Sequence, residues 1–117
     1  MTVPWGQYHE AYKEIAERLK RGAIWTHFSK TASGNIISPS SGKRLRLLVF
    51  FFSSNADIIT SLRFSSTGDD MFPLQQKGAV GMNLIGAWAP QGNADEPLYA
   101  YLSGTGTMKG SVLTEEV

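Results

Sequence analysis

The sequence predicts an α+β domain in which an N-terminal amphipathic helix packs on a strongly bent antiparallel sheet of five to seven strands. Apolar residues recur at a helical period over residues 4–21 and then alternate with polar ones over residues 23–113. No second helical segment follows that could carry a parallel crossover, so antiparallel pairing is expected. Closure of the sheet into a partial barrel is the alternative that this pattern leaves open.

Length and composition indicate a folded chain and exclude several classes of site. The chain has 117 residues, of which 42% are hydrophobic and 18% charged, with a formal net charge of +1. We expect residues 1–117 to form a single domain. Cysteine is absent, which excludes disulfide frameworks, thiolate metal sites and cysteine nucleophiles. The longest apolar run, residues 47–52, is too short to cross a membrane, and residues 1–6 do not resemble a signal peptide. We therefore expect a cytoplasmic protein that binds no membrane.

The predicted helix over residues 4–21 has recognisable ends and one apolar side. Pro4 suits a first helical turn, and Gly22 suits the left-handed residue that often follows a helix. Glu14 and Arg18 have the spacing of a favourable ion pair on a helix surface. The apolar residues lie within an arc of about 100° and are Trp5, Tyr8, Tyr12, Ile15, Ala16 and Leu19.

The segments after Gly22 have the composition of strands separated by turns. Residues 44–52 and 58–65 carry the strongest apolar pattern and are predicted to pair as a hairpin. Pro73 restricts its segment to the edge of a sheet. The candidate strands are residues 23–29, 36–37, 44–52, 58–65, 71–76, 80–88, 98–103 and 108–113.

A four-residue loop gives this hairpin a definite register with two different sides. One side carries Phe51 and is predicted to face the core, so that Phe51→Asp should give unfolded or insoluble protein. The other side carries Phe50 and Phe52 and places Arg46 directly opposite Arg63. Two opposed arginines repel each other unless an anion or an acidic side chain lies between them.

This second side suggests binding of single-stranded nucleic acid as an alternative function. Such binding needs cations that follow the phosphate backbone and aromatic rings on which bases can stack. The competing interpretation is that the helix covers this side and leaves the arginines at its rim, near acidic residues. The candidate residues are Lys43, Arg44, Arg46, Arg63, Phe50, Phe52, Trp25 and Lys30.

The function that we favour from the sequence is protein–protein interaction or self-assembly. Both sides of residues 44–52 are apolar, whereas one helix is available to cover them. The remaining apolar surface has to be hidden by closure of the sheet, by a ligand or by another subunit. Trp88, Tyr99 and Tyr101 add large rings of the kind found at interfaces. We therefore expect a small non-catalytic binding protein that forms a homo-oligomer or binds a protein partner.

Catalysis and ligand transport rank behind these interpretations. His9 and His27 are the only histidines, and no pattern of a nucleophile, general base or metal site accompanies them. We predict no catalytic residue, no metal site and no cofactor. An apolar pocket between helix and sheet, lined by methionines and aromatic residues, would instead make the chain a carrier of a small apolar ligand.

Overall fold

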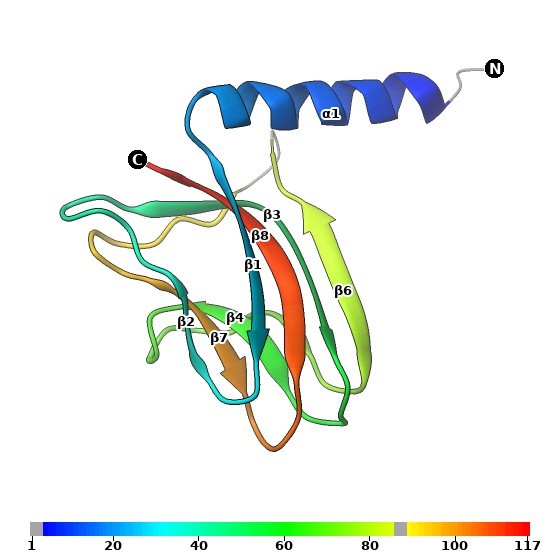
Figure 1. The fold of residues 1–117 in the computed structure, drawn as a ribbon, viewed down its shortest axis with the longest axis vertical. Helices are drawn as coiled ribbons and strands as arrows, with labels where there is room; N and C mark the ends of the chain where they lie inside the picture. Colours follow the sequence, from blue (N-terminus) through cyan, green and yellow to red (C-terminus); the bar gives the residue numbers. More distant parts are fainter. Residues whose placement is uncertain (1–3, 86–88) are drawn as a thin grey trace.

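The computed structural model, which describes residues 4–85 and 89–117, is a sandwich of two four-stranded antiparallel sheets with one helix across its end (Figure 1). Sheet A has the strand order β1-β8-β3-β6, and sheet B has the order β2-β7-β4-β5. The elements are α1 (Pro4–Lys20), β1 (Ile24–Lys30), β2 (Gly34–Ile37), β3 (Leu45–Ser54), β4 (Thr60–Phe64), β5 (Met71–Leu74), β6 (Gly78–Asn83), β7 (Leu98–Leu102) and β8 (Met108–Glu116). Two packed sheets joined in this order form an eight-stranded jelly roll. Because jelly rolls occur in proteins of unrelated function, the fold itself selects no function.

The predicted fold class is therefore wrong in its central feature, the single bent sheet of five to seven strands. The antiparallel pairing is confirmed, but the described strands number eight and form two separate sheets instead of a partly closed barrel. The predicted hairpin of residues 44–52 and 58–65 is not formed. In its place, β3 lies between β8 and β6 while β4 lies between β7 and β5. The short connection between β3 and β4 crosses from one sheet to the other, so sheet B covers one side of β3.

A β-bulge in β3 decides which of its side chains face the core. Leu47 is opposite Thr114 and Val49 is opposite Leu113, so Leu48 is an extra residue in the ladder. An extra residue reverses the alternation of side chains beyond it. Phe50 and Phe52 are consequently buried, whereas Phe51 is 55% exposed. The core assignment of Phe51 is thus wrong, and with it the reason for expecting Phe51→Asp to unfold the protein.

The hydrophobic core fills the space between the two sheets. Phe50 stacks on Phe72 from β5, with 4.3 Å between the ring centroids, which links sheet A to sheet B. The buried members of this core are Leu45, Leu47, Phe50, Phe52, Leu62, Leu84, Leu98, Ala100, Leu102, Met108 and Val112.

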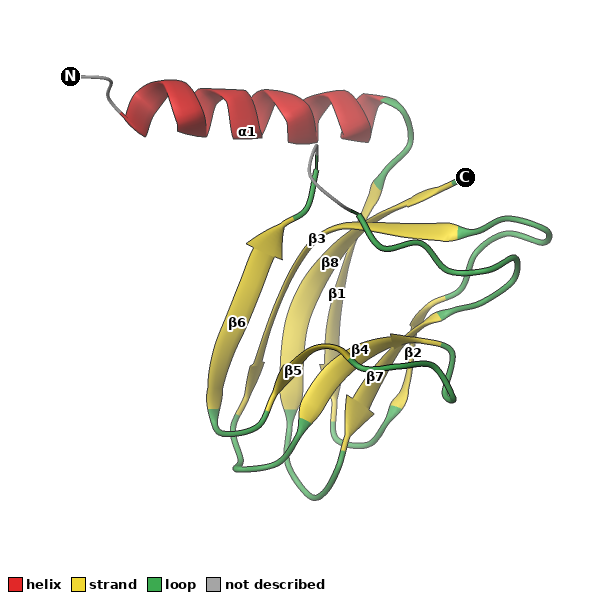
Figure 2. Ribbon diagram, turned by 180° about the vertical axis from the view of Figure 1, so that it is seen from behind, coloured by secondary structure: helices red, strands yellow, loops and turns green. Residues whose placement is uncertain are grey.

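Helix α1 agrees closely with the predicted helix over residues 4–21, and the described side chains in its C-terminal half attach it to the sandwich. It lies across one end of the sandwich, roughly perpendicular to the strands of sheet A (Figures 1 and 2). Ile15 packs against a small cluster of Ala23, Leu48 and Leu113, whereas Tyr12 is 73% exposed. The described side chains of α1 therefore lie over the end of the outer face of sheet A. In the described part of the chain, no helix has the length and apolar character needed to span a membrane.

Candidate interaction surface

The outer face of sheet A is built from alternate residues of its four strands. Because Phe50, Phe52, Met108 and Val112 point into the core, the residues between them point away from sheet B. Beyond the bulge, cross-strand pairing arranges the outward residues in three rows, which are Trp25–Leu113–Val49–Asn83, His27–Ser111–Phe51–Gly81 and Ser29–Lys109–Ser53–Ala79. Lys109 is the one Lys, Arg, Asp or Glu among these twelve described positions. A fourth row, beside α1, contains the cross-strand neighbours Glu115 and Arg46.

In the middle row, the neighbours of Phe51 on the adjacent strands are small. Phe51 lies between Ser111 of β8 and Gly81 of β6. A Cβ atom at Gly81 would lie 2.7 Å from the Cβ of Phe51, so any larger residue would be forced against that side chain. The neighbouring strands therefore offer Phe51 no large side chain to pack against in this row.

A shallow depression of about 310 Å³ adjoins Phe51 on this face and is lined by Trp25, His27, Phe51 and Ser111. Nδ1 of His27 forms a hydrogen bond with the hydroxyl group of Ser111. This bond satisfies the buried hydroxyl and leaves the aromatic side chains as the main contact surface. The depression is thus an apolar surface with a single internally bonded polar pair.

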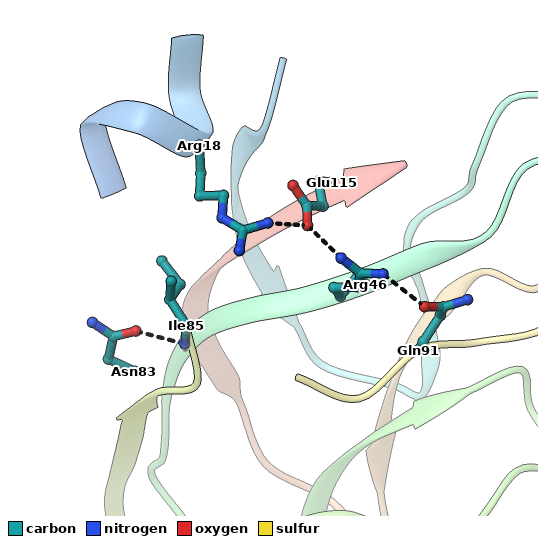
Figure 3. Close-up of polar contacts among 6 residues, drawn as sticks. All are labelled: Arg18, Arg46, Asn83, Ile85, Gln91 and Glu115. Atoms are coloured by element: carbon teal, nitrogen blue, oxygen red, sulfur yellow. Dashed lines mark hydrogen bonds and ion pairs between the residues drawn. The ribbon is translucent and has the colours of Figure 1, made fainter. Parts of the chain in front are cut away.

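The row beside α1 carries the charged groups that attach the helix to sheet A (Figure 3). The guanidinium of Arg18 donates a hydrogen bond of 2.7 Å to Glu115, and Arg46 donates one of 3.1 Å to the same carboxylate oxygen. Arg46 also donates to Oε1 of Gln91 at 3.1 Å. The Glu115 side chain is only 11% exposed. One carboxylate thus ties the helix and β3 together, and it engages the arginine that the sequence suggested for anion binding.

The outer face of sheet B has a different character because its polar groups satisfy one another. Nε of Arg63 donates to Asp70 at 2.6 Å, and the hydroxyl of Ser61 donates to the same carboxylate oxygen at 2.6 Å. The hydrogen bond from Arg63, followed by that from Ser61, lowers the pKa of Asp70, and the same contact raises the pKa of Arg63. The Arg63 guanidinium also lies 3.8 Å from the ring centroid of Tyr101.

The structure separates the residues that the sequence suggested for nucleic-acid binding. Phe50 and Phe52 are buried in the core, so neither ring is available for base stacking. Arg46 lies on sheet A and Arg63 on sheet B, so the predicted opposition of the two arginines is wrong. The remaining members are Lys43 and Arg44 in the exposed segment before β3, Lys30 at the end of β1 and Trp25 on the outer face of sheet A.

Of the three predicted interface residues, two lie on the outer face of sheet B and the third is outside the described residues. Tyr99 and Tyr101 point outward from β7 beside Arg63, where both are half-buried. Trp88 lies outside the described residues. The sequence did not identify Phe51 as a surface residue. Gly81, in the segment that forms β6, was a signal, because a glycine leaves the residue opposite it without a side chain to pack against.

Comparison with known proteins gives no further guide to this surface. No family model matches the sequence, and a search of curated proteins found no significant match. Within residues 4–85 and 89–117, no group of three or more His, Asp or Glu residues is placed to hold a metal ion. The functional argument therefore depends on the geometry and chemistry of the two outer faces.

Proposed function

We propose that this chain is a non-catalytic protein-interaction domain that self-associates through the outer face of sheet A. The observation that supports this proposal is the 55% exposure of Phe51 at the centre of a nearly uncharged sheet face. Trp25 and the depression beside it extend the apolar area. Large aromatic side chains surrounded by apolar or satisfied groups are the residues that contribute most to protein interfaces.

Burial of this face has little electrostatic cost. Removal of apolar surface from water is favourable by about 25 cal/mol per Å², and a buried charge without a partner opposes association. Lys109 lies in the row farthest from α1, away from Trp25. A contact centred on Phe51 can therefore bury the rings of Phe51 and Trp25 and leave the ammonium group of Lys109 at the solvated rim.

The outer face of sheet B is a poorer candidate for the same role. Arg63 and Asp70 already satisfy each other, and burial of this pair would remove both charges from water without adding a partner. The nucleic-acid alternative gains no support from the geometry, because two of its three arginines, Arg46 and Arg63, are paired with carboxylates and two of its rings are in the core.

Sedimentation velocity from micromolar to millimolar protein tests the proposal. We expect the wild-type chain to form a dimer or larger species, and Phe51→Asp to weaken this association by at least about tenfold. Ile59→Asp is the matched control because Ile59 is also an exposed large apolar residue, 38% exposed, but lies outside this face. Circular dichroism establishes that each variant is folded.

A wild-type chain that remains monomeric throughout this range would contradict the proposal. Association of Phe51→Asp at the wild-type concentration would do so as well. Loss of association in both variants would show that any added charge has this effect, and would equally remove the assignment to sheet A.

A further inference from the structure

The four edge strands of the sandwich differ in how they are protected. An exposed strand edge pairs readily with another strand, and proteins block this with short strands, bulges, proline or charge. In sheet B, β2 has four residues and an irregular register between Asn35 and Ile37, whereas β5 contains Pro73 and the left-handed residue Phe72, with φ of 54°. In sheet A, β1 ends in Lys30.

The fourth edge, β6, has none of these protective features within the strand, and its nearest charge is Lys77, just before it. Its six residues, Gly78–Asn83, include neither a charged residue nor proline, and five of the six are exposed. Its register with β3 is regular from Val49 to Ser54. Figures 1 and 2 both show β6 as the outermost strand of sheet A, with no other described segment beside its outer edge.

Backbone geometry identifies the groups that this edge presents. The N–H of Leu84 donates to the carbonyl of Leu48 at 2.7 Å, which continues the antiparallel register of β6 with β3. Because such bonded pairs recur at every second residue, the even-numbered residues of β6 face β3. The N–H and C=O groups of Ala79, Gly81 and Asn83 therefore point outward, and no described residue forms a hydrogen bond with them.

We infer that β6 pairs antiparallel with β6 of a second copy of this chain, across a two-fold axis at Gly81. This inference rests on the proposed self-association and adds a second contact to it, because pairing at this edge leaves Phe51 and the outer face of sheet A free for the contact proposed above. In this register Ala79 pairs with Asn83 of the second copy, Gly81 with Gly81, and Asn83 with Ala79. Each pair exchanges two hydrogen bonds, so every outward backbone group is satisfied. Symmetric registers shifted along the strand leave at least one of the three residues unpaired.

The side chains around this edge favour a second copy over a charged peptide. The edge has no charge with which to select such a partner, whereas its own pattern of donors and acceptors is complementary to itself. Phe51 is the neighbour of Gly81 on β3, so the pairing places both Phe51 side chains on one continuous outer face. Three strand spacings, about 14 Å, separate their positions, with two glycines between them.

The contact is small, which determines how it should be measured. A stable interface buries about 800 Å² on each partner, and a six-residue edge provides less than this. We therefore expect a reversible dimer with a dissociation constant in the micromolar range or weaker. A covalent trap is the appropriate probe of its register.

Because the chain has no cysteine, an engineered disulfide reports on this pairing alone. In the double variant Ala79→Cys/Asn83→Cys, each cysteine lies opposite its counterpart in the second copy, at a Cα separation of about 5.5 Å that a disulfide can span. In either single variant, the equivalent cysteines lie about 13 Å apart along the strands. We expect the double variant to form a disulfide-linked dimer under mild oxidation at least about tenfold faster than either single variant.

Ala79→Pro provides a second, non-covalent measurement. Proline removes the outward N–H of Ala79 and leaves the bonds from β6 to β3 in place, so association should be weakened by at least about tenfold in a folded protein. Ala79→Lys introduces a protective charge at the same position and should weaken association in the same way. It replaces the proline variant as the test if that variant does not fold.

The inference is overturned if the double variant cross-links no faster than the single variants, or if both Ala79 variants associate like wild type. These results would leave the proposed function intact, provided that Phe51→Asp still abolishes association. A wild-type chain that is monomeric, with no selective cross-link in the double variant, would contradict both.

Discussion

The two sheets share one core but differ on their outer sides. Sheet A has strands of six to ten residues, and beyond the ion pair of Arg46 and Glu115 beside α1 its outer face has one Lys, Arg, Asp or Glu among twelve outward positions. Sheet B has strands of four or five residues, and its outer face carries an ion pair with its own hydrogen-bond partners. This difference shows that some large apolar side chains of sheet A, such as Phe51, are not buried between the two sheets. Those that remain outside define the surface most suited to a partner.

The bulge at Leu48 produces much of this difference. It allows Leu48 to pack near α1 with Ile15 and Leu113, and it directs Phe50 and Phe52 inward on the other side of the irregularity. Phe51 is consequently placed outside. One extra residue in β3 therefore supplies both the attachment of the helix and the exposed ring.

The largest expected effect compares the two sides of β3. Phe52→Ala should reduce the free energy of unfolding by about 3–5 kcal/mol, because it leaves a cavity in the core. Phe51→Ala should change it by only about 0.5 kcal/mol, because that ring lies outside. Urea unfolding at a protein concentration low enough to avoid association measures both. Equal losses would show that the two phenylalanines are not on opposite faces.

A smaller effect is expected from the carboxylate that attaches α1 to sheet A. Glu115→Gln should lower the free energy of unfolding by about 2 kcal/mol, because Arg18 and Arg46 lose their shared anionic partner in a largely buried position. Hydrogen exchange should also become faster in the last turns of α1. Lys13→Gln, which removes an exposed charge on a different side of the helix from Arg18, is the control and should change neither quantity. Similar behaviour of the two variants would contradict this role of Glu115.

The smallest effect concerns the ion pair on sheet B. Asp70→Asn should reduce the free energy of unfolding by about 0.5 kcal/mol at neutral pH, since the pair is partly exposed. The pKa of Asp70 is lowered in the folded state, so its contribution is present above the unfolded pKa and is lost as the pH falls through the folded pKa. Denaturation at neutral and strongly acidic pH should show the difference from wild type disappearing in acid. Asp69→Asn, which removes the neighbouring exposed charge and leaves the ion pair in place, is the control.

Local patterns in the sequence were sufficient to predict α1 and the approximate positions of the strands. They could not determine which strands pair, because the alternating segments of β3 and β4 suit a hairpin and two separate sheets equally well. The bulge was also not predictable, since Leu47 and Leu48 are both apolar and either can be the extra residue. Its effect on the alternation reversed the assignments of Phe50, Phe51 and Phe52.

The candidate surface depended on contacts between distant parts of the chain. Arg46 and Glu115 are 69 positions apart, so the sequence showed an unpaired cation where the fold supplies a carboxylate. Arg63 and Asp70 are close in sequence, but the turn that joins them had to be known before their pairing could be recognised. Trp25, predicted as a ring for nucleic-acid binding, lies on the outer face of sheet A, whereas the neighbours that line the depression with it there, His27, Phe51 and Ser111, were not predicted as surface residues.

The most direct test of the central claim is a dilution series followed by two-dimensional NMR of the backbone amides. As the protein concentration rises, we expect the resonances of Phe51, Gly81 and Ser111 on sheet A to shift, while those of Arg63 and Tyr101 on sheet B stay in place. Shifts confined to sheet B, or a spectrum that does not change with concentration, would contradict the account.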